Sequence, residues 1–138
     1  MKHITKNLFL FIVFGSIYFL IETLWKGHIT HWSMFLLAGA AGLLIGGINE
    51  YLPWEMPFIL QCGIGMVIST VLEGITGMIV NVWLHLNVWH YNRLAFWCNQ
   101  CSVYYCLAWF TLSGVCILLD DWLRWKCFGE DKPHYTLK

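Results

Sequence analysis

Four apolar segments, separated by short polar stretches, run along the chain. They extend from Leu8 to about Trp25, from Trp32 to Ile48, from Phe58 to Leu84 and from Cys101 to Leu123. Each is close to or above the ~20 residues with which an α-helix crosses the ~30 Å hydrocarbon core of a bilayer. Tryptophans flank the segments, as they do at membrane–water interfaces. The pattern predicts an all-α membrane protein, a four-helix transmembrane bundle.

Small and polar residues recur at every fourth position through the third segment. Because residues four apart lie on nearly the same face of an α-helix, these positions form one slanting stripe. Small residues let a neighbouring helix approach closely, and polar residues need partners away from lipid. The stripe therefore predicts the face that points into the bundle. Its members are Gln61, Gly65, Ser69, Glu73, Gly77, Asn81 and His85.

A second stripe with the same spacing lies in the second segment. Its members are Ala38, Gly42, Gly46 and Glu50. Two such stripes in consecutive helices favour close, right-handed packing of the second helix against the third. The connection between these helices, residues 49–57, is short, so we expect an antiparallel hairpin. The glycines that we expect to set the helix contacts are Gly42, Gly46, Gly65 and Gly77.

Composition supports the membrane assignment. The chain has 138 residues, of which 59% are apolar and only 12% are charged, whereas soluble domains carry about 25% charged residues. Residues 1–138 form a single transmembrane domain, since no polar stretch is long enough to fold alone. The formal net charge is zero. The apolar composition makes the lipid bilayer the expected surrounding. A nucleic-acid partner is not expected, because a chain without net positive charge lacks the basic field that attracts phosphates.

Lysine and arginine residues predict the orientation. With four spans, both termini lie on one side, and that side carries six of these residues against two on the other. Because positively charged flanks stay in the cytoplasm, we expect cytoplasmic termini in a multi-pass protein of the cell membrane. The charged tail after Arg124 is expected to be loose. The six residues are Lys2, Lys6, Arg124, Lys126, Lys132 and Lys138, and the two are Lys26 and Arg93.

Glu73 is the main candidate for function. It lies near the middle of the third segment, where a charge costs about 2.5–3.5 kcal/mol or more unless it is neutralised, paired or hydrated. A proton or cation relay and a substrate contact are the functional interpretations, and a structural carboxyl group bonded to another helix is the alternative. Glu22, four residues before Lys26, is either a second carboxylate of the site or half of an interfacial ion pair. The expected auxiliary polar groups are Gln61, Ser69, Asn81 and Gln100.

The connection between the third and fourth segments carries potential metal ligands, His85, His90, Cys98 and Cys101. Imidazole and thiolate bind zinc, but these spacings differ from those of standard zinc fingers. A thiol-redox centre is a second interpretation, although the chain lacks the outer cysteine pair with which such a centre exchanges. The third is that the cysteines pack as small apolar residues at a helix start. We therefore expect neither a metal nor a cofactor.

Acidic groups gather where the second and fourth segments end. Asp120 lies four residues before Arg124, a spacing that favours an ion pair on one helix face. Asp121, Asn49 and Glu50 are expected on the same side of the membrane. Two interpretations are open: local ion pairs at helix ends, or a cytoplasmic mouth that attracts cations.

One stretch resembles a known family. Leu72-Glu73, Thr76-Gly77, Trp89, Tyr91 and Gln100 match a pattern of Leu-Glu-x2-Thr-Gly, Trp-Asp-Tyr-Ser and Gly-Gln. Over about residues 8–132 the chain is similar to the ABC-transporter type IV family of small bacterial membrane proteins. The resemblance implies a permease that works with a separate ATPase subunit. The departures from the pattern, all in the connection, are His90 for Asp, Asn92 for Ser, Ala95 for Pro and Asn99 for Gly.

These patterns favour a small integral membrane transport component, either a permease-like subunit or a compact channel or carrier, built around Glu73. The chain has no phosphate-binding loop, serine-hydrolase elbow or zinc-protease motif, so we do not expect an enzyme. A bundle of this size leaves little room for a transport pathway within a single subunit, so a homo-oligomer or a larger membrane partner is expected. Two alternatives are a holin-like pore or scaffold protein and a membrane thiol oxidoreductase that uses Cys98 and Cys101.

Overall fold

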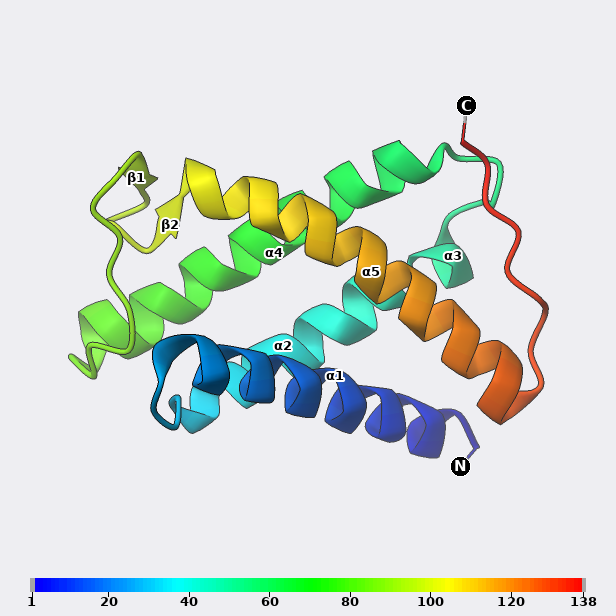
Figure 1. The fold of residues 1–138 in the computed structure, drawn as a ribbon, viewed down its shortest axis with the longest axis horizontal. Coiled ribbons are helices and arrows are strands. Elements are labelled where there is room, and N and C mark those ends of the chain that lie inside the picture. Colours follow the sequence, from blue (N-terminus) through cyan, green and yellow to red (C-terminus); the bar gives the residue numbers. More distant parts are fainter. Residues whose placement is uncertain (1, 138) are drawn as a thin grey trace.

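The chain folds into a bundle of helices in the computed structural model, which describes residues 2–137 (Figure 1). Two two-residue strands, β1 (Ala95–Phe96) and β2 (Cys101–Ser102), pair antiparallel just before the last helix. The chain is thus mostly helical, as predicted, with one small hairpin added. The helices are α1 (Lys2–Lys26), α2 (Trp32–Gly46), α3 (Ile48–Tyr51), α4 (Phe58–Gly77), its π-helical continuation η1 (Met78–Trp83) and α5 (Val103–Phe128).

Within residues 2–137, three helical segments are long and apolar enough to cross a membrane. They are Lys2–Lys26, Phe58–Trp83 and Val103–Phe128. Large apolar side chains such as Leu20 (59% exposed) and Leu107 (66% exposed) cover their outer faces, which a surrounding of lipid accounts for and water does not. The chain therefore has the character of a membrane protein.

The second predicted span is shorter than expected. Helix α2 has 15 residues, which extend only about 22 Å at 1.5 Å per residue. The helix stops at Gly46, and Gly47 turns the chain into the short helix α3 instead of continuing through Ile48. The bounds of the first and last helices also differ from the predicted segments: α1 begins at Lys2, and α5 covers Val103–Phe128.

The long helices alternate in direction (Figure 1). The start of α1 lies beside the end of α5. Lys6 forms an ion pair with Glu130 there, and the rings of Phe9 and Phe128 pack with their centroids 5.6 Å apart. We call this the terminal end. At the opposite end lies the connection between η1 and α5, residues 84–102, which we call the link. The most extensive contacts are those of α1 with α2 and of α4 with α5.

The glycine contacts differ in partner from the prediction. A Cβ atom on Gly42 would lie 2.4 Å from Phe14 of α1, and one on Gly46 would lie 2.7 Å from Asp120 of α5. On α4, a Cβ on Gly65 would lie 2.6 Å from Ser113 of α5. The small residues of α2 and α4 therefore admit side chains of α1 and α5. A Cβ on Gly65 would also lie 3.0 Å from Ile45, so α2 and α4 contact each other as well. A Cβ on Gly77 would likewise lie 2.7 Å from the side chain of Gln100 in the link.

The tail after α5 is ordered, contrary to the prediction. The carbonyl oxygen of Thr136 accepts a 2.7 Å hydrogen bond from the backbone N–H of Phe58, the first residue of α4. The ring of His134 stacks on Trp54 with centroids 4.5 Å apart, and Tyr135 packs against the buried cluster of α2, α3 and α5. Charge pattern alone suggested a loose tail, but its aromatic residues hold it against the bundle.

The acidic residues at the terminal end form a network of ion pairs and hydrogen bonds, which favours the interpretation of local ion pairs over that of a cation-attracting mouth. Asp120 is fully buried and accepts a 2.6 Å hydrogen bond from Nε of Arg124. Asp121 accepts hydrogen bonds from Asn49 (3.0 Å) and Tyr135 (2.8 Å). The predicted pair of Asp120 with Arg124 is confirmed, and these carboxylates bind other side chains instead of lining an opening.

We expect substitution of Gly42 by alanine to destabilise the protein. The added methyl group would overlap Phe14, and relieving such overpacking typically costs about 1–3 kcal/mol. Gly63 is the matched control, because a Cβ there meets no described atom within 4 Å, and alanine favours the helix. Thermal unfolding in detergent should give a lower melting temperature for Gly42→Ala and an equal or higher one for Gly63→Ala. Equal melting temperatures for the two variants would contradict the tight α1–α2 contact.

Candidate functional site

Glu73 lies halfway along the segment formed by α4 and η1, on the face that points into the bundle. Its side chain is only 5% exposed. The hydroxyl group of Tyr91, from the link, donates a 3.2 Å hydrogen bond to its Oε2 atom. The thiol of Cys101 and the indole N–H of Trp109 also lie beside this carboxyl group, the indole outside good hydrogen-bond geometry. The acid is therefore held between α4, the link and α5.

A cavity of about 160 Å³ lies between α1, α2, α4 and α5, and Glu73 forms part of its wall. Most of the lining is apolar, with side chains such as Phe14, Ile17 and Met34. Polar groups come from α1, which contributes Tyr18, from α4, which contributes Ser69 and Glu73, and from α5, which contributes Trp109 and Ser113. We call this space the central cavity. It combines a carboxyl group with a surface suited to an apolar ligand.

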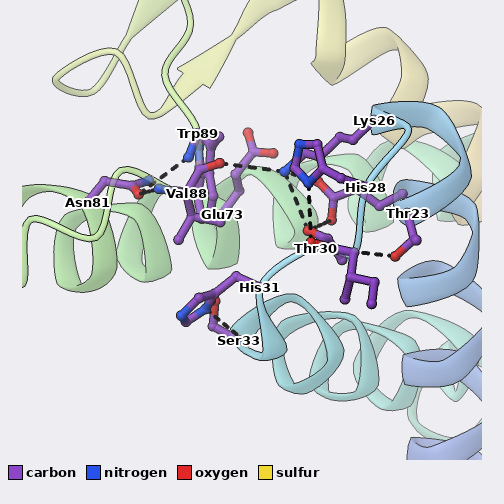
Figure 2. A network of polar contacts seen from close by, with 12 residues as sticks. Thr23, Lys26, His28, Thr30, His31, Ser33, Glu73, Asn81, Val88 and Trp89 are labelled. Atoms are coloured by element: carbon purple, nitrogen blue, oxygen red, sulfur yellow. Dashed lines mark hydrogen bonds and ion pairs between the residues drawn. The ribbon is translucent and has the colours of Figure 1, made fainter.

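A cluster of polar side chains around Lys26 connects α1 to the link (Figure 2). Lys26 pairs with Glu22 at 3.3 Å, so the predicted ion pair on α1 is confirmed. The same ammonium group lies 3.5 Å from the carbonyl oxygen of Val88, and the hydroxyl of Thr30 donates to Glu22 at 3.3 Å. In Figure 2 the side chain of Glu73 extends from α4 toward this network. Glu22 and Glu73 are close enough to interact electrostatically.

Asn81 holds the link onto the end of the α4 segment. Its side-chain amide donates to Oε1 of Gln100 at 2.7 Å, and its oxygen accepts from the backbone N–H groups of Val88 (2.6 Å) and Trp89 (3.4 Å). The indole of Trp89 in turn donates to the carbonyl oxygen of Gln100 at 3.0 Å. Asn81 belongs to the π-helical η1, and such wide turns recur at functional sites. Two predicted polar groups, Asn81 and Gln100, thus meet directly.

Tyr91 connects the link to the carboxyl group. Its ring stacks on Tyr105 of α5, with centroids 4.6 Å apart. Burial, with the nearby carboxylate of Glu73 as a further cause, raises the pKa of the Tyr91 hydroxyl above its ordinary value. The hydroxyl therefore stays protonated near neutral pH and acts as a donor to Glu73. All three link residues that carried the family resemblance, Trp89, Tyr91 and Gln100, take part in these contacts.

The predicted stripe is divided among three places. Ser69 and Glu73 line the central cavity, whereas Asn81 serves the link. Gln61 is buried near the terminal end of α4 and donates to the carbonyl oxygen of Met56 at 3.2 Å, so it braces the α3–α4 connection. His85 lies beyond η1, exposed and with a positive φ of 53°. The stripe is therefore a series of separate contacts and not one polar path.

The histidines and cysteines of the link do not assemble into a metal site. Within residues 2–137, no group of three or more His, Cys, Asp or Glu side chains is arranged to hold a metal ion. His90 faces Asn99 at 3.4 Å, and His85 is exposed. The link has three consecutive residues in the left-handed conformation, Trp97, Cys98 and Asn99.

The Cys98–Cys101 pair is not bonded. Both are free thiols, Cys98 exposed and Cys101 buried, and the Sγ atom of Cys101 donates to the carbonyl oxygen of Thr70 at 3.4 Å. Burial and the nearby Glu73 raise the pKa of the Cys101 thiol to about 12. A thiolate is the reactive form in disulfide exchange, so this environment does not favour the redox interpretation.

Two residues of the cavity were not anticipated from the sequence. Tyr18 of α1 packs its ring against Trp109 with centroids 5.9 Å apart, and Ser113 of α5 lines the same space. Ser113 and Gly114 form a small, polar pair inside an apolar segment, the signal that marked the α4 stripe. The same kind of signal in the fourth segment therefore marks a residue of the cavity wall.

Comparison with known proteins adds no relative. No protein-family model, no curated protein and no solved structure matches this chain.

We expect replacement of Asn81 by alanine to release the link. Two backbone N–H groups and the Gln100 side chain would lose their partner, at about 1–3 kcal/mol for each buried group left unpaired. Asn92→Ala, at an exposed position of the link, is the matched control. Hydrogen exchange followed by mass spectrometry should show faster exchange across residues 84–102 in Asn81→Ala alone. Unchanged exchange would mean that Asn81 does not hold the link.

Proposed function

We propose that this protein is a small membrane transport component in which Glu73 contacts the transported species or the coupling proton. The observation that carries the proposal is the position of Glu73 on the wall of the central cavity. A buried acid is costly in a membrane protein, and structural stability alone would favour an apolar residue there. A scaffold protein would need neither the acid nor the cavity.

The proposed topology is four membrane spans with both termini in the cytoplasm of the cell. It rests on the alternating helix directions and on the excess of lysine and arginine at the terminal end. The short helix α2 would then cross a locally thinned bilayer or one covered by neighbouring helices. In this orientation the link faces the outside.

We further propose that the chain works as a homo-oligomer or with a larger membrane partner. A cavity of about 160 Å³ holds one small group, so a full pathway across the bilayer would be completed by other subunits. The resemblance to ABC-transporter type IV proteins favours a partner with ATPase activity. The same face of α4 that carries Glu73 also carries the residues of that resemblance, Thr76 and Gly77.

The transport proposal is tested by substituting Glu73 with glutamine. The protein is reconstituted in vesicles on a solid-supported membrane, and currents are recorded for panels of organic cations, organic anions, neutral solutes and inorganic ions. At least one class should evoke a current, and Glu73→Gln should reduce it tenfold or more because the carboxyl group is lost. Glu55→Gln, at an exposed loop position, should leave the current unchanged.

Three outcomes count against this proposal. If no class evokes a current in the wild-type protein, transport by the chain alone is excluded. If Glu73→Gln retains the full current, Glu73 is not part of the mechanism. A leak that does not discriminate between solutes would indicate a holin-like pore instead.

The topology is tested with the two exposed cysteines, Cys98 in the link and Cys127 at the terminal end. In sealed, right-side-out membranes, a membrane-impermeant maleimide should label Cys98 and spare Cys127. Inverted vesicles should give the opposite result. Cys98→Ser and Cys127→Ser variants identify the labelled site by mass spectrometry. Labelling of both residues from one side would contradict the four-span arrangement.

A further inference from the structure

The size of the central cavity limits what it can hold. Its volume is about 160 Å³, and an apolar cavity of about 150 Å³ in another protein stays dry and binds benzene. The cavity therefore fits one ring-sized apolar group.

Polar groups on one side of the cavity have no partner in the part of the chain that the structure describes. The hydroxyl group of Ser113 is 2% exposed and makes no hydrogen bond, and the indole N–H of Trp109 is buried beside Glu73 without one. Buried polar groups are nearly always satisfied. Their presence beside an apolar space indicates that a ligand with both apolar and polar parts completes this wall.

The charges around the cavity favour a cation. Among residues 2–137 no ion pair involves Glu73, and the nearby ammonium group of Lys26 is already paired with Glu22. The rings of Tyr18 and Trp109, which touch each other, line the same space. Aromatic faces attract organic cations, and the carboxyl group of Glu73, which has no cationic partner among the described residues, disfavours anions.

We propose that the central cavity binds an organic cation with one ring-sized apolar group, a small aromatic or alicyclic amine. The ring would occupy the apolar space between α1, α2 and α5, and the ammonium group would lie against Glu73 and the faces of Tyr18 and Trp109. This inference rests on the proposed transport function, since it names the substrate class for the same site.

Binding is tested first on the wild-type chain in detergent, by isothermal titration with three probes of similar size. Phenethylammonium carries the positive charge, 2-phenylethanol is its neutral analogue, and 3-phenylpropionate is an anionic one. Titrations of protein-free micelles are subtracted. Phenethylammonium should bind at least about tenfold more tightly than either analogue. Equal affinity for the cation and the alcohol would overturn the proposal, as would preference for the anion.

Variants then locate the binding site. Glu73→Gln should weaken phenethylammonium binding about tenfold or more, and Glu55→Gln should leave it unchanged. Ala41→Phe places a ring in the apolar part of the cavity and should abolish binding while Glu73 stays in place. If Glu73→Gln shows no cooperative thermal transition, Ala41→Phe and the wild-type probe series still decide. Full binding in Ala41→Phe would place the ligand elsewhere.

A lipid tail is the main competing occupant. Native mass spectrometry should show phenethylammonium displacing any co-purified lipid from the wild-type chain, and retention of an acyl chain under saturating cation would contradict the proposal. The measurements also separate this inference from the transport proposal. Tight cation binding without any evoked current would support the proposed binding site and contradict transport. A current evoked only by another solute class would support transport and contradict the proposed cationic ligand.

Discussion

The need to satisfy polar groups inside the protein determines much of this structure. In lipid, an amide, hydroxyl or carboxyl group without a partner is costly, and α4 with η1 carries several of them along one face. The chain meets this constraint by folding the link back over the bundle. Tyr91 reaches Glu73, and Gln100 reaches Asn81. Only the end of the link, Gln100 to Ser102, is fully buried, whereas most of the link is exposed.

The same constraint accounts for the terminal end. Polar side chains there form hydrogen bonds with one another. Asp121 accepts hydrogen bonds from Asn49 and Tyr135, and the buried Asp120 accepts one from Arg124. Removing one partner of such a buried group costs more than the group contributes when paired. Both ends of the bundle are thus held by polar contacts, and buried polar atoms without a partner among residues 2–137 occur at the terminal end, as at Asp120, as well as at the central cavity, at Trp109 and Ser113.

Much of the helical framework followed from the apolar segments, because their length and composition decide whether a segment forms a long helix. The burial of Glu73, Gly65 and Gly77 also follows from their spacing of four along α4. Spacing could not predict which helix each residue would meet. Gly42 admits Phe14 of α1 instead of packing on α4, since the choice depends on the shapes of all facing side chains. The stop at Gly47, the π-helical turn and the ordered tail depend on tertiary contacts in the same way.

The bond between Thr136 and Phe58 joins parts of the chain that the ribosome makes far apart in time. The backbone N–H of Phe58 starts α4 and has no partner within its own helix, so it lacks this partner until residue 136 has been synthesised. All the long helices will have been synthesised by then, and the first turn of α4 stays uncovered until the tail docks on it. Insertion of the helices and completion of the fold are therefore separate events, and a stalled or shortened chain would present an open helix start to chaperones and proteases.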